Sequence, residues 1–199
     1  GKQIQGAILM IVDIMEKYFP GKTALVTGGT GLVGREVCTI LADWECSVTS
    51  ISMDDLEFDS RVNYWKGDLF DFNLCKKVIR DFDYVFHLAG VKGSPKMSAL
   101  QPAKFFVPTI MMNTNVLEAA RLNKIPKLVY TSSIGAYPHK AHLQEMSLYS
   151  WLAEERNPMD GYPGWAKLLG EMQIDTYRRT YHQEVNGWSI CRLSSIYGP

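Results

Sequence analysis

Hydrophobic and polar positions follow two alternating periods along this chain. Short apolar runs rich in β-branched and aromatic residues, bounded by glycine or polar residues, are typical of buried strands. They occur at 23–28, 46–52, 62–67, 84–90, 127–133 and 188–195. Apolar residues at helical spacing fall between these runs, at 31–43, 72–81, 103–122 and 163–181. Strand and helix in steady alternation predict a parallel sheet covered on both faces, the doubly wound α/β fold class.

The first twenty residues carry a helical pattern of their own. Ile4, Ile8, Ile11 and Met15 recur on one face before the sequence PGK, which predicts an N-terminal amphipathic helix within 1–20. A packing or dimer contact is its expected use. The apolar stretch inside it is too short to span a bilayer, so we expect neither a membrane anchor nor a signal peptide.

The longest stretch without clear periodicity, 134–161, predicts an irregular loop over the carboxyl edge of the sheet. Such loops often carry function, so we interpret this one as lying on the substrate side. The chain then stops at RLSSIYGP, directly after its last predicted strand. The sequence therefore predicts a domain over 21–199 that ends before most of a substrate-binding portion.

Composition narrows the class of partner. The 21 basic residues balance the 21 acidic ones, and no Lys/Arg-rich block appears, so neither a nucleic-acid surface nor an anionic membrane is expected. A small molecule becomes the default partner. The four cysteines are widely spaced without a metal-binding pattern, and they are interpreted as reduced core thiols of a cytoplasmic protein with no metal site.

The sequence TGGTGLVG at 27–34 follows a predicted strand and opens a predicted helix. In this context Gly28 permits a tight turn, Gly31 lets the backbone approach a diphosphate, and Gly34 lets the helix pack closely on the strand. The free N–H groups of the helix start then face the phosphates. The motif predicts a dinucleotide-binding Rossmann fold. The expected contacts from this loop are Gly28, Gly31, Leu32, Val33 and Gly34.

The end of the second strand leaves the choice of coenzyme open between NADP and NAD. Ser52 is small enough to admit a 2'-phosphate, with Arg35 or Arg61 as counter-charge. Asp54, two residues later, can instead hold the ribose 2'-hydroxyl and reject a phosphate. We expect both Ser52 and Asp54 at the coenzyme, with a slight preference for NADP.

Six ordered motifs resemble the extended short-chain dehydrogenase/reductases, the NAD-dependent epimerase/dehydratase group. They are TGGTGLVG, GDL at 67–69, HLAG at 87–90, YTSSIGAYP at 130–138, KLLGE at 167–171 and RLSSIYGP at 192–199. The match covers 23–199. Two further segments, AGVKGSP and FFVPTIMMNTNVLEAA, look most like the GDP-L-fucose synthase branch, which epimerises and reduces a GDP-sugar with NADPH.

The resemblance implies an NAD(P)-dependent enzyme that epimerises, dehydrates or reduces a nucleotide-diphosphate sugar by hydride transfer. It also implies a homodimer paired through the long helices at 103–122 and 163–181. Carried over by position, it places Asp68 and Leu69 at the adenine. It places Leu88, Ala89 and Gly90 at the ribose and diphosphate, and Lys167 at the nicotinamide ribose.

The same resemblance assigns catalytic residues. Ser133 matches the catalytic serine or threonine, with Ser132 as the near alternative and capping of the strand end as the plain structural role. Tyr137, His139 and His142 are interpreted as scaffold or loop residues.

The chemistry of this family depends on a tyrosine. Its hydroxyl exchanges a proton with the substrate oxygen while hydride moves to or from the nicotinamide. A nearby lysine ammonium favours the phenolate and lowers the tyrosine pKa toward neutrality. The tyrosine stands four residues before the lysine, because that spacing brings two side chains to one face of a helix. Lys167 matches the lysine.

Here the position four residues before Lys167 is Pro163, and the tyrosine, Tyr162, comes one place earlier. On a continuous helix Tyr162 lies about 140° around the axis from Lys167. Because proline favours the first helical position and pushes the preceding residue to extended geometry, Tyr162 is expected at the N-cap. From there its side chain can swing back over the first turn.

Two interpretations follow from this order of Tyr162 and Pro163. In the first, Tyr162 remains the acid/base beside Ser133 and Lys167, and the chain is an enzyme. In the second, the phenol is misplaced and the chain is a catalytically impaired NAD(P)-binding protein of the same fold. The sequence favours the first, because the serine, the lysine and the cofactor loop all persist.

Overall fold

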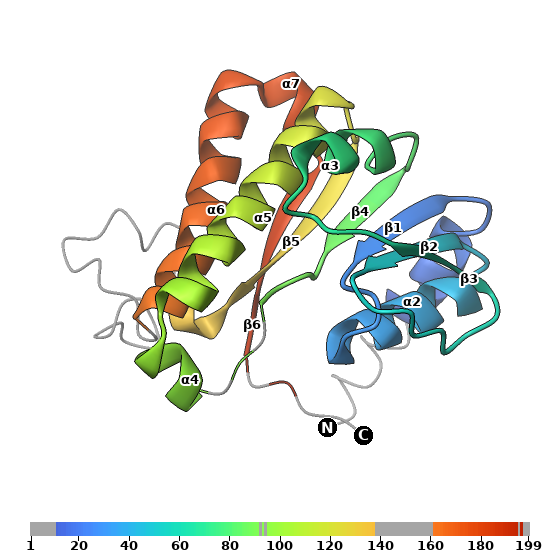
Figure 1. The fold of residues 1–199 in the computed structure, drawn as a ribbon. Helices are drawn as coiled ribbons and strands as arrows, with labels where there is room; N and C mark the ends of the chain where they lie inside the picture. Colours follow the sequence, from blue (N-terminus) through green and yellow to red (C-terminus); the bar gives the residue numbers. More distant parts are fainter. Residues whose placement is uncertain (1–10, 92, 94, 138–160, 195, 197–199) are drawn as a thin grey trace, which may run out of the picture.

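The computed structural model describes residues 11–91, 93, 95–137, 161–194 and 196, and Figure 1 shows their arrangement. The strands are β1 (Thr23–Thr27), β2 (Ser47–Ser52), β3 (Val62–Lys66), β4 (Tyr84–His87), β5 (Lys127–Ser133) and β6 (Trp188–Leu193). The helices are α2 (Leu32–Asp43), α3 (Phe72–Val78), α4 (Pro95–Leu100), α5 (Ala103–Leu122), α6 (Tyr162–Thr180) and α7 (His182–Val185), with a 3₁₀ turn, η1 (Ile134–Ala136).

The strands form a parallel sheet in the order β3-β2-β1-β4-β5-β6. From β1, the chain adds β2 and then β3 toward one edge of the sheet. From β4, which lies beside β1, it adds β5 and then β6 toward the other edge. Connections that leave two adjacent strands in opposite directions open a crevice at their carboxyl ends. The doubly wound α/β prediction is confirmed, and the order places a ligand crevice between β1 and β4.

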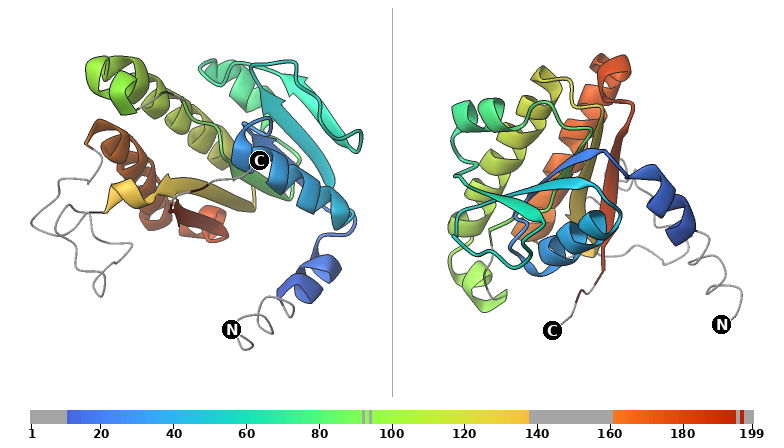
Figure 2. Two further views of the ribbon diagram at one scale, coloured as in Figure 1. Left: turned by 90° about the horizontal axis from the view of Figure 1, so that it is seen from below. Right: turned by 90° about the vertical axis from the view of Figure 1, so that its right-hand side faces the viewer.

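Helices cover both faces of the sheet because side chains alternate along each strand. Leu25 of β1 belongs to a buried cluster with residues of α3, α5 and α6. Its neighbours Ala24 and Val26 belong to a second cluster with α2 and Phe19. Figure 2 shows α5 on one side of the sheet and the helical residues 11–18 on the other. The two clusters therefore form the two layers of the core.

Within the described residues, the expected boundaries of strands and helices hold within a few residues, with three short elements that the sequence pattern missed. These are α4, α7 and η1, each of six residues or fewer. Ile4 and Ile8 of the expected N-terminal helix, and 138–160 of the expected loop, lie outside the described residues. The turn η1 begins the stretch expected to be irregular, because Ser133 caps it by accepting a hydrogen bond from the Gly135 N–H. Helix α3 ends at Val78 instead of residue 81, and Asp81 takes a left-handed backbone with φ of 63°.

Three of the four cysteines, Cys38, Cys46 and Cys75, are buried, and burial raises the pKa of each thiol. The expectation of a core position is wrong for Cys191, which is exposed on β6. This strand lies at the edge of the described sheet, where fewer neighbouring elements cover the side chains. In the described ranges, no helix combines the length and apolar character needed to cross a bilayer.

Candidate functional site

The glycine-rich turn after β1 has the geometry that its sequence predicts. Gly28 has φ of 68°, a left-handed conformation that glycine adopts without strain. Its N–H donates to the Ile51 carbonyl at 2.8 Å, and its own carbonyl accepts from the Gly31 N–H at 3.0 Å. A Cβ atom on Gly34 would lie 2.2 Å from the Gly28 oxygen, so only glycine permits this approach of α2 to β1.

The start of α2 presents unpaired donors. Gly31 is the N-cap, with extended backbone and no side-chain oxygen accepting from the first turn. The N–H groups of that turn therefore remain available, at the positive end of the helix dipole. Donors in this arrangement favour a phosphate or diphosphate group.

A cavity of about 650 Å³, here called the first cavity, opens beside this turn. It is lined by twelve of the thirteen residues that the sequence assigned to the cofactor: Gly28, Gly31, Leu32, Val33, Gly34, Ser52, Asp54, Asp68, Leu69, Leu88, Ala89 and Gly90. The thirteenth, Lys167, lies elsewhere. The structure thus brings together residues that follow β1, β2, β3 and β4, at the crevice that the strand order predicts.

Asp54 is held at the rim of the first cavity by hydrogen bonds. Its carboxylate accepts from the Thr30 hydroxyl at 2.9 Å and from the Leu56 N–H at 3.2 Å. Ser52 lies beside it and its hydroxyl oxygen accepts from the Thr30 N–H at 3.4 Å. A carboxylate fixed here can receive hydrogen bonds from ribose hydroxyls and repels a 2'-phosphate.

The two arginines considered as phosphate counter-charges make other contacts. Arg61 bonds to Asp59 and Asp43, each at 2.7 Å, and this pairing lowers the pKa of Asp59 to about 2. Arg35 donates from Nε to the Thr30 carbonyl at 3.0 Å. Neither arginine lines the first cavity.

Sequence reasoning missed several residues of the first cavity, most of them outside its motifs. They include Thr30, Ile51, Met53, Gly67, Phe70, Val91, Lys104, Pro108 and Met112. Lys104, Pro108 and Met112 come from α5, which packs over the crevice from the side. Pro108 and Met112 fall within the segment FFVPTIMMNTNVLEAA, but its pattern does not say which of its residues face the cavity, because their place depends on how α5 docks against the sheet. Lys104 adds the one cation among the lining residues described.

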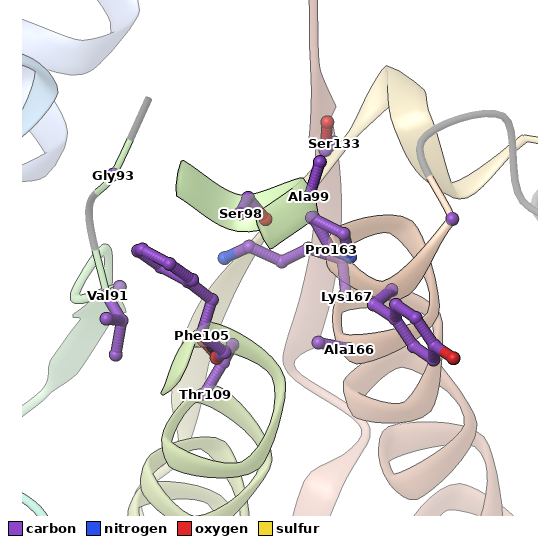
Figure 3. A pocket seen from close by; sticks show the side chains of 13 residues that line it. Val91, Gly93, Ser98, Ala99, Phe105, Thr109, Ser133, Pro163, Ala166 and Lys167 are labelled. Carbon is purple, nitrogen blue, oxygen red and sulfur yellow. Dashed lines mark hydrogen bonds between the residues drawn. The ribbon is translucent and has the colours of Figure 1, made fainter. Parts of the chain in front are cut away.

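A second cavity, of about 620 Å³, meets the first at Gly90 and Val91. Residues from α4 and the starts of α5 and α6 line it, together with Ser133 at the end of β5. Lys167 reaches from α6 into this space, as Figure 3 shows. A ligand that fills the first cavity can therefore extend past Gly90 toward Lys167.

Lys167 is partly buried and its ammonium lacks a carboxylate partner among the described residues. Nζ donates to the Thr131 carbonyl at 2.8 Å and lies 5.4 Å from the centre of the Tyr130 ring. Burial without a compensating negative charge disfavours the ammonium. It lowers the pKa of Lys167 to about 8.

A buried chain of hydrogen bonds lies behind Lys167. Thr27 Oγ1 is 2.8 Å from His87 Nδ1, and His87 Nε2 is 3.0 Å from Asn113 Oδ1. Asn113 Nδ2 donates to the Tyr130 hydroxyl at 3.0 Å, and that hydroxyl donates to the Lys167 carbonyl at 3.1 Å. Burial, reinforced by the Lys167 charge, lowers the pKa of His87 to about 3, so the imidazole is neutral. This chain connects β1 of the first cavity to α6 of the second.

The two candidate serines have different surroundings. Ser132 is buried and donates to the carboxylate of Glu171, which also binds Arg192 through two contacts of 2.8 and 2.6 Å. Ser133 Oγ accepts from the Gly135 N–H at 3.1 Å and lines the second cavity. Only Ser133 therefore has both the cap role and access to a ligand.

Tyr162 is not the N-cap of α6, contrary to the expectation. Gly161 takes that position with φ of 60° and ψ of −129°, and Tyr162 and Pro163 both lie in the first helical turn. Glycine absorbs the change of chain direction, so the residue before the proline is free to be helical. Tyr162 is 57% exposed and packs edge-on against Phe106 of α5, with ring centres 5.6 Å apart.

The remaining candidates contribute little to either cavity. The Tyr137 ring packs 4.2 Å from the guanidinium of Arg192, which agrees with a scaffold role. His139 and His142 lie outside the described residues. Within those residues, no group of three or more His, Cys, Asp or Glu side chains is arranged to hold a metal ion.

Known proteins resemble this chain in sequence and fold. The model of the NAD dependent epimerase/dehydratase family matches residues 24–199. A UDP-glucose 4-epimerase of Rickettsia bellii is 30% identical over 62% of this chain and 40% of its own length. A GDP-mannose 3,5-epimerase of Arabidopsis thaliana is 27% identical over 92% of this chain and 50% of its own.

Solved structures agree with these relatives. The UDP-glucose 4-epimerase of Thermus thermophilus in complex with NAD is 26% identical, with a TM-score of 0.71 over 89% of this chain and 56% of that one. The chain spans about half the length of the curated relatives it matches. The narrower likeness to GDP-L-fucose synthase stays a prediction.

Proposed function

Because the chain belongs to the NAD-dependent epimerase/dehydratase family, we propose that it binds NAD(H) in the first cavity and exchanges hydride with a nucleotide-diphosphate sugar in the second. One observation carries the proposal. The twelve residues expected at the coenzyme line a single cavity, which meets the cavity containing Ser133 and Lys167 at Gly90 and Val91. A dinucleotide extends over such a crevice with its diphosphate at the helix start.

The residues of the chain have distinct roles in this proposal. A bound nicotinamide supplies a carbon that accepts or donates hydride. The N–H groups at the start of α2 hold the diphosphate, and Asp54 receives hydrogen bonds from the adenosine ribose. Lys167 lies where it can reach the nicotinamide ribose. The Ser133 hydroxyl can donate to a substrate oxygen on which negative charge develops.

A second candidate function is coenzyme binding without the usual catalysis of the family. The position of Tyr162 favours it. On the continuous helix α6 this tyrosine lies five residues before Lys167, about 140° around the axis, and its ring contacts Phe106. The proposed enzyme therefore needs another acid/base, or a movement of Tyr162 when ligand binds.

The substrate class comes from the relatives. Relatives named as epimerases of UDP-glucose and GDP-mannose support a nucleotide sugar without deciding its base. Homodimer formation through α5 and α6 remains part of the proposal, supported by the exposure of Val107 and Met111 on α5. A cytoplasmic location stays a prediction.

The proposal is tested by titrating the chain with NADH and NADPH and following nicotinamide fluorescence. We expect NADH to bind at least about tenfold more tightly, because Asp54 repels a 2'-phosphate. This revises the slight preference for NADP based on Ser52. Asp54→Asn should reduce the discrimination by about tenfold, which corresponds to about 1.4 kcal/mol.

Asp55→Asn is the matched control, since Asp55 pairs with Lys66 and does not line the first cavity. The control should leave the NADH to NADPH ratio unchanged. Failure to bind either coenzyme would contradict the whole proposal. Bound coenzyme without turnover of any nucleotide sugar would support the second candidate function.

A further inference from the structure

We propose that Lys167 is itself the acid/base of the second cavity and exchanges a proton directly with the substrate hydroxyl. This inference rests on the hydride exchange proposed above. In the family that the sequence motifs resemble, a tyrosine exchanges this proton and the lysine assists it. In this chain Pro163 stands where that tyrosine is expected, so Lys167 is left both to hold the coenzyme and to exchange the proton.

The composition of the second cavity is the first argument. Among the described residues that line it, Tyr162 and Lys167 are the titratable side chains. Tyr162 is largely exposed, and its ring rests on Phe106. Pro163, which lies only about 40° around the helix from Lys167, has no proton to exchange. Lys167 is therefore the titratable group placed to meet a ligand in this cavity.

The surroundings of Lys167 are the second argument. Strand β5 supplies the Thr131 carbonyl and the Tyr130 ring, and β4 supplies His87, which is neutral. On α6 itself, the Glu171 carboxylate one turn later is bound to Arg192. No charge from these elements offsets the loss of water around the ammonium. The pKa of about 8 that results makes about one lysine in ten a neutral amine at pH 7.

The lysine is also held in place, as an acid/base must be. One N–H of Nζ donates to the Thr131 carbonyl, which directs the head group toward the end of β5. The Tyr130 hydroxyl fixes the backbone of the same residue by donating to its carbonyl. The rest of the amine is free to accept or donate one proton.

The proposed step is balanced in atoms and charge. In the oxidative direction, the hydrogen on the sugar carbon leaves as hydride to oxidised nicotinamide. The neutral Lys167 amine takes the hydroxyl proton, and the electrons of the O–H bond form the second C–O bond of the ketone. Ser133 donates a hydrogen bond to that oxygen. The reductive direction reverses each transfer and starts from the ammonium.

Lys167→Arg and Lys167→Met form the main test. Arginine keeps a positive charge and hydrogen-bond donors but does not lose its proton in the accessible pH range. Lys167→Arg should bind NADH within about threefold of the native chain yet lose turnover about a hundredfold or more. Lys167→Met should weaken NADH binding and also lower turnover. An arginine variant that keeps turnover within tenfold overturns the proposal, because Lys167 would then only hold charge.

The second readout is independent of turnover. Trace acetylation across a pH series, followed by peptide mass spectrometry, reports the pKa of each amine. Lys167 should show a midpoint near 8, well below the value of about 10.4 that is ordinary for a lysine amine. An ordinary midpoint at Lys167 overturns the proposal, whether or not the chain is active.

The pH dependence of the rate and a tyrosine variant complete the test. Oxidation should become faster through pH 8 as the amine forms, and reduction should become slower. Tyr162→Phe should keep this midpoint, and its complete loss of turnover would overturn the proposal while leaving the hydride exchange intact. A native chain that binds NADH but turns over no nucleotide sugar would instead contradict the hydride exchange, and the proton step with it.

Discussion

The two cavities meet at Gly90 and Val91, yet they are built by different means. The first is shaped largely by backbone: glycines that permit close approach, a helix start with free N–H groups, and the carboxyl ends of β1, β2, β3 and β4. The second is formed by side chains from α4, α5, α6 and the end of β5. The first cavity can therefore be changed by a single methyl group, whereas the second depends on how separate elements are held together.

A buried ion pair holds the second cavity together. Glu171 of α6 and Arg192 of β6 are 1% and 3% exposed at the side chain, and Ser132 of β5 donates to the same carboxylate. These contacts join three elements directly behind Ser133 and Lys167. The exposed pairs on the first half of the chain, such as Lys17 with Asp13, have no comparable role.

The largest effect is expected when one member of this ion pair is removed. Arg192→Met leaves the Glu171 carboxylate buried without its cation, which costs about 3 to 5 kcal/mol in the free energy of unfolding. Urea denaturation measures the loss. Lys17→Met, at an exposed pair, should cost less than about 1 kcal/mol.

A double variant sharpens this comparison. Glu171→Leu combined with Arg192→Met removes both buried charges, and it should recover at least half of the stability lost in the single variant. A double variant as unstable as Arg192→Met would show that packing, and not the uncompensated charge, determines the effect.

The next effect concerns the first cavity. Gly34→Ala places a Cβ atom 2.2 Å from the Gly28 oxygen and must push α2 away from β1. We expect NADH affinity to fall about a hundredfold, which corresponds to about 2.7 kcal/mol, with a lowered melting temperature. Gly90→Ala is the control for folding, because a Cβ atom there meets nothing within 4 Å. NADH affinity unchanged in Gly34→Ala would contradict the placement of the diphosphate.

The contrast also explains what the sequence could predict. The first cavity follows from contiguous motifs, because TGGTGLVG, GDL and HLAG each end a strand at the same edge of a parallel sheet. The fold follows for the same reason, since each strand and its following helix are local. Among the residues missed in this cavity, Lys104, Pro108 and Met112 come from α5 and gain their place only by the docking of that helix.

The second cavity shows the limit of such reasoning. The sequence named Ser133 and Lys167, and both line it. It placed Tyr162 at the N-cap, because proline usually makes the preceding residue extended. The structure gives that role to Gly161, whose positive φ is a backbone property that spacing alone does not reveal. The pairing of Glu171 with Arg192, 21 residues apart in the chain, has no local pattern either.

His87 lines neither cavity but lies in the hydrogen-bond chain that runs between them, so its titration gives the finest test of how they are coupled. Its imidazole connects Thr27 of β1 to Asn113 and through it to the Tyr130 hydroxyl. The folded pKa of about 3 lies below the ordinary value of about 6.5. The unfolded chain therefore binds a proton that the folded chain does not, and stability should fall as pH falls below about 6.5.

This loss should reach about 2 kcal/mol between pH 7 and pH 5, measured by urea denaturation at each pH. His87→Gln should be less stable at pH 7 but should show a flatter dependence over that range, because glutamine does not titrate. Equal slopes in His87→Gln and the native chain would mean that His87 accepts its proton in the folded state. The hydrogen-bond chain between the two cavities would then open without unfolding the protein.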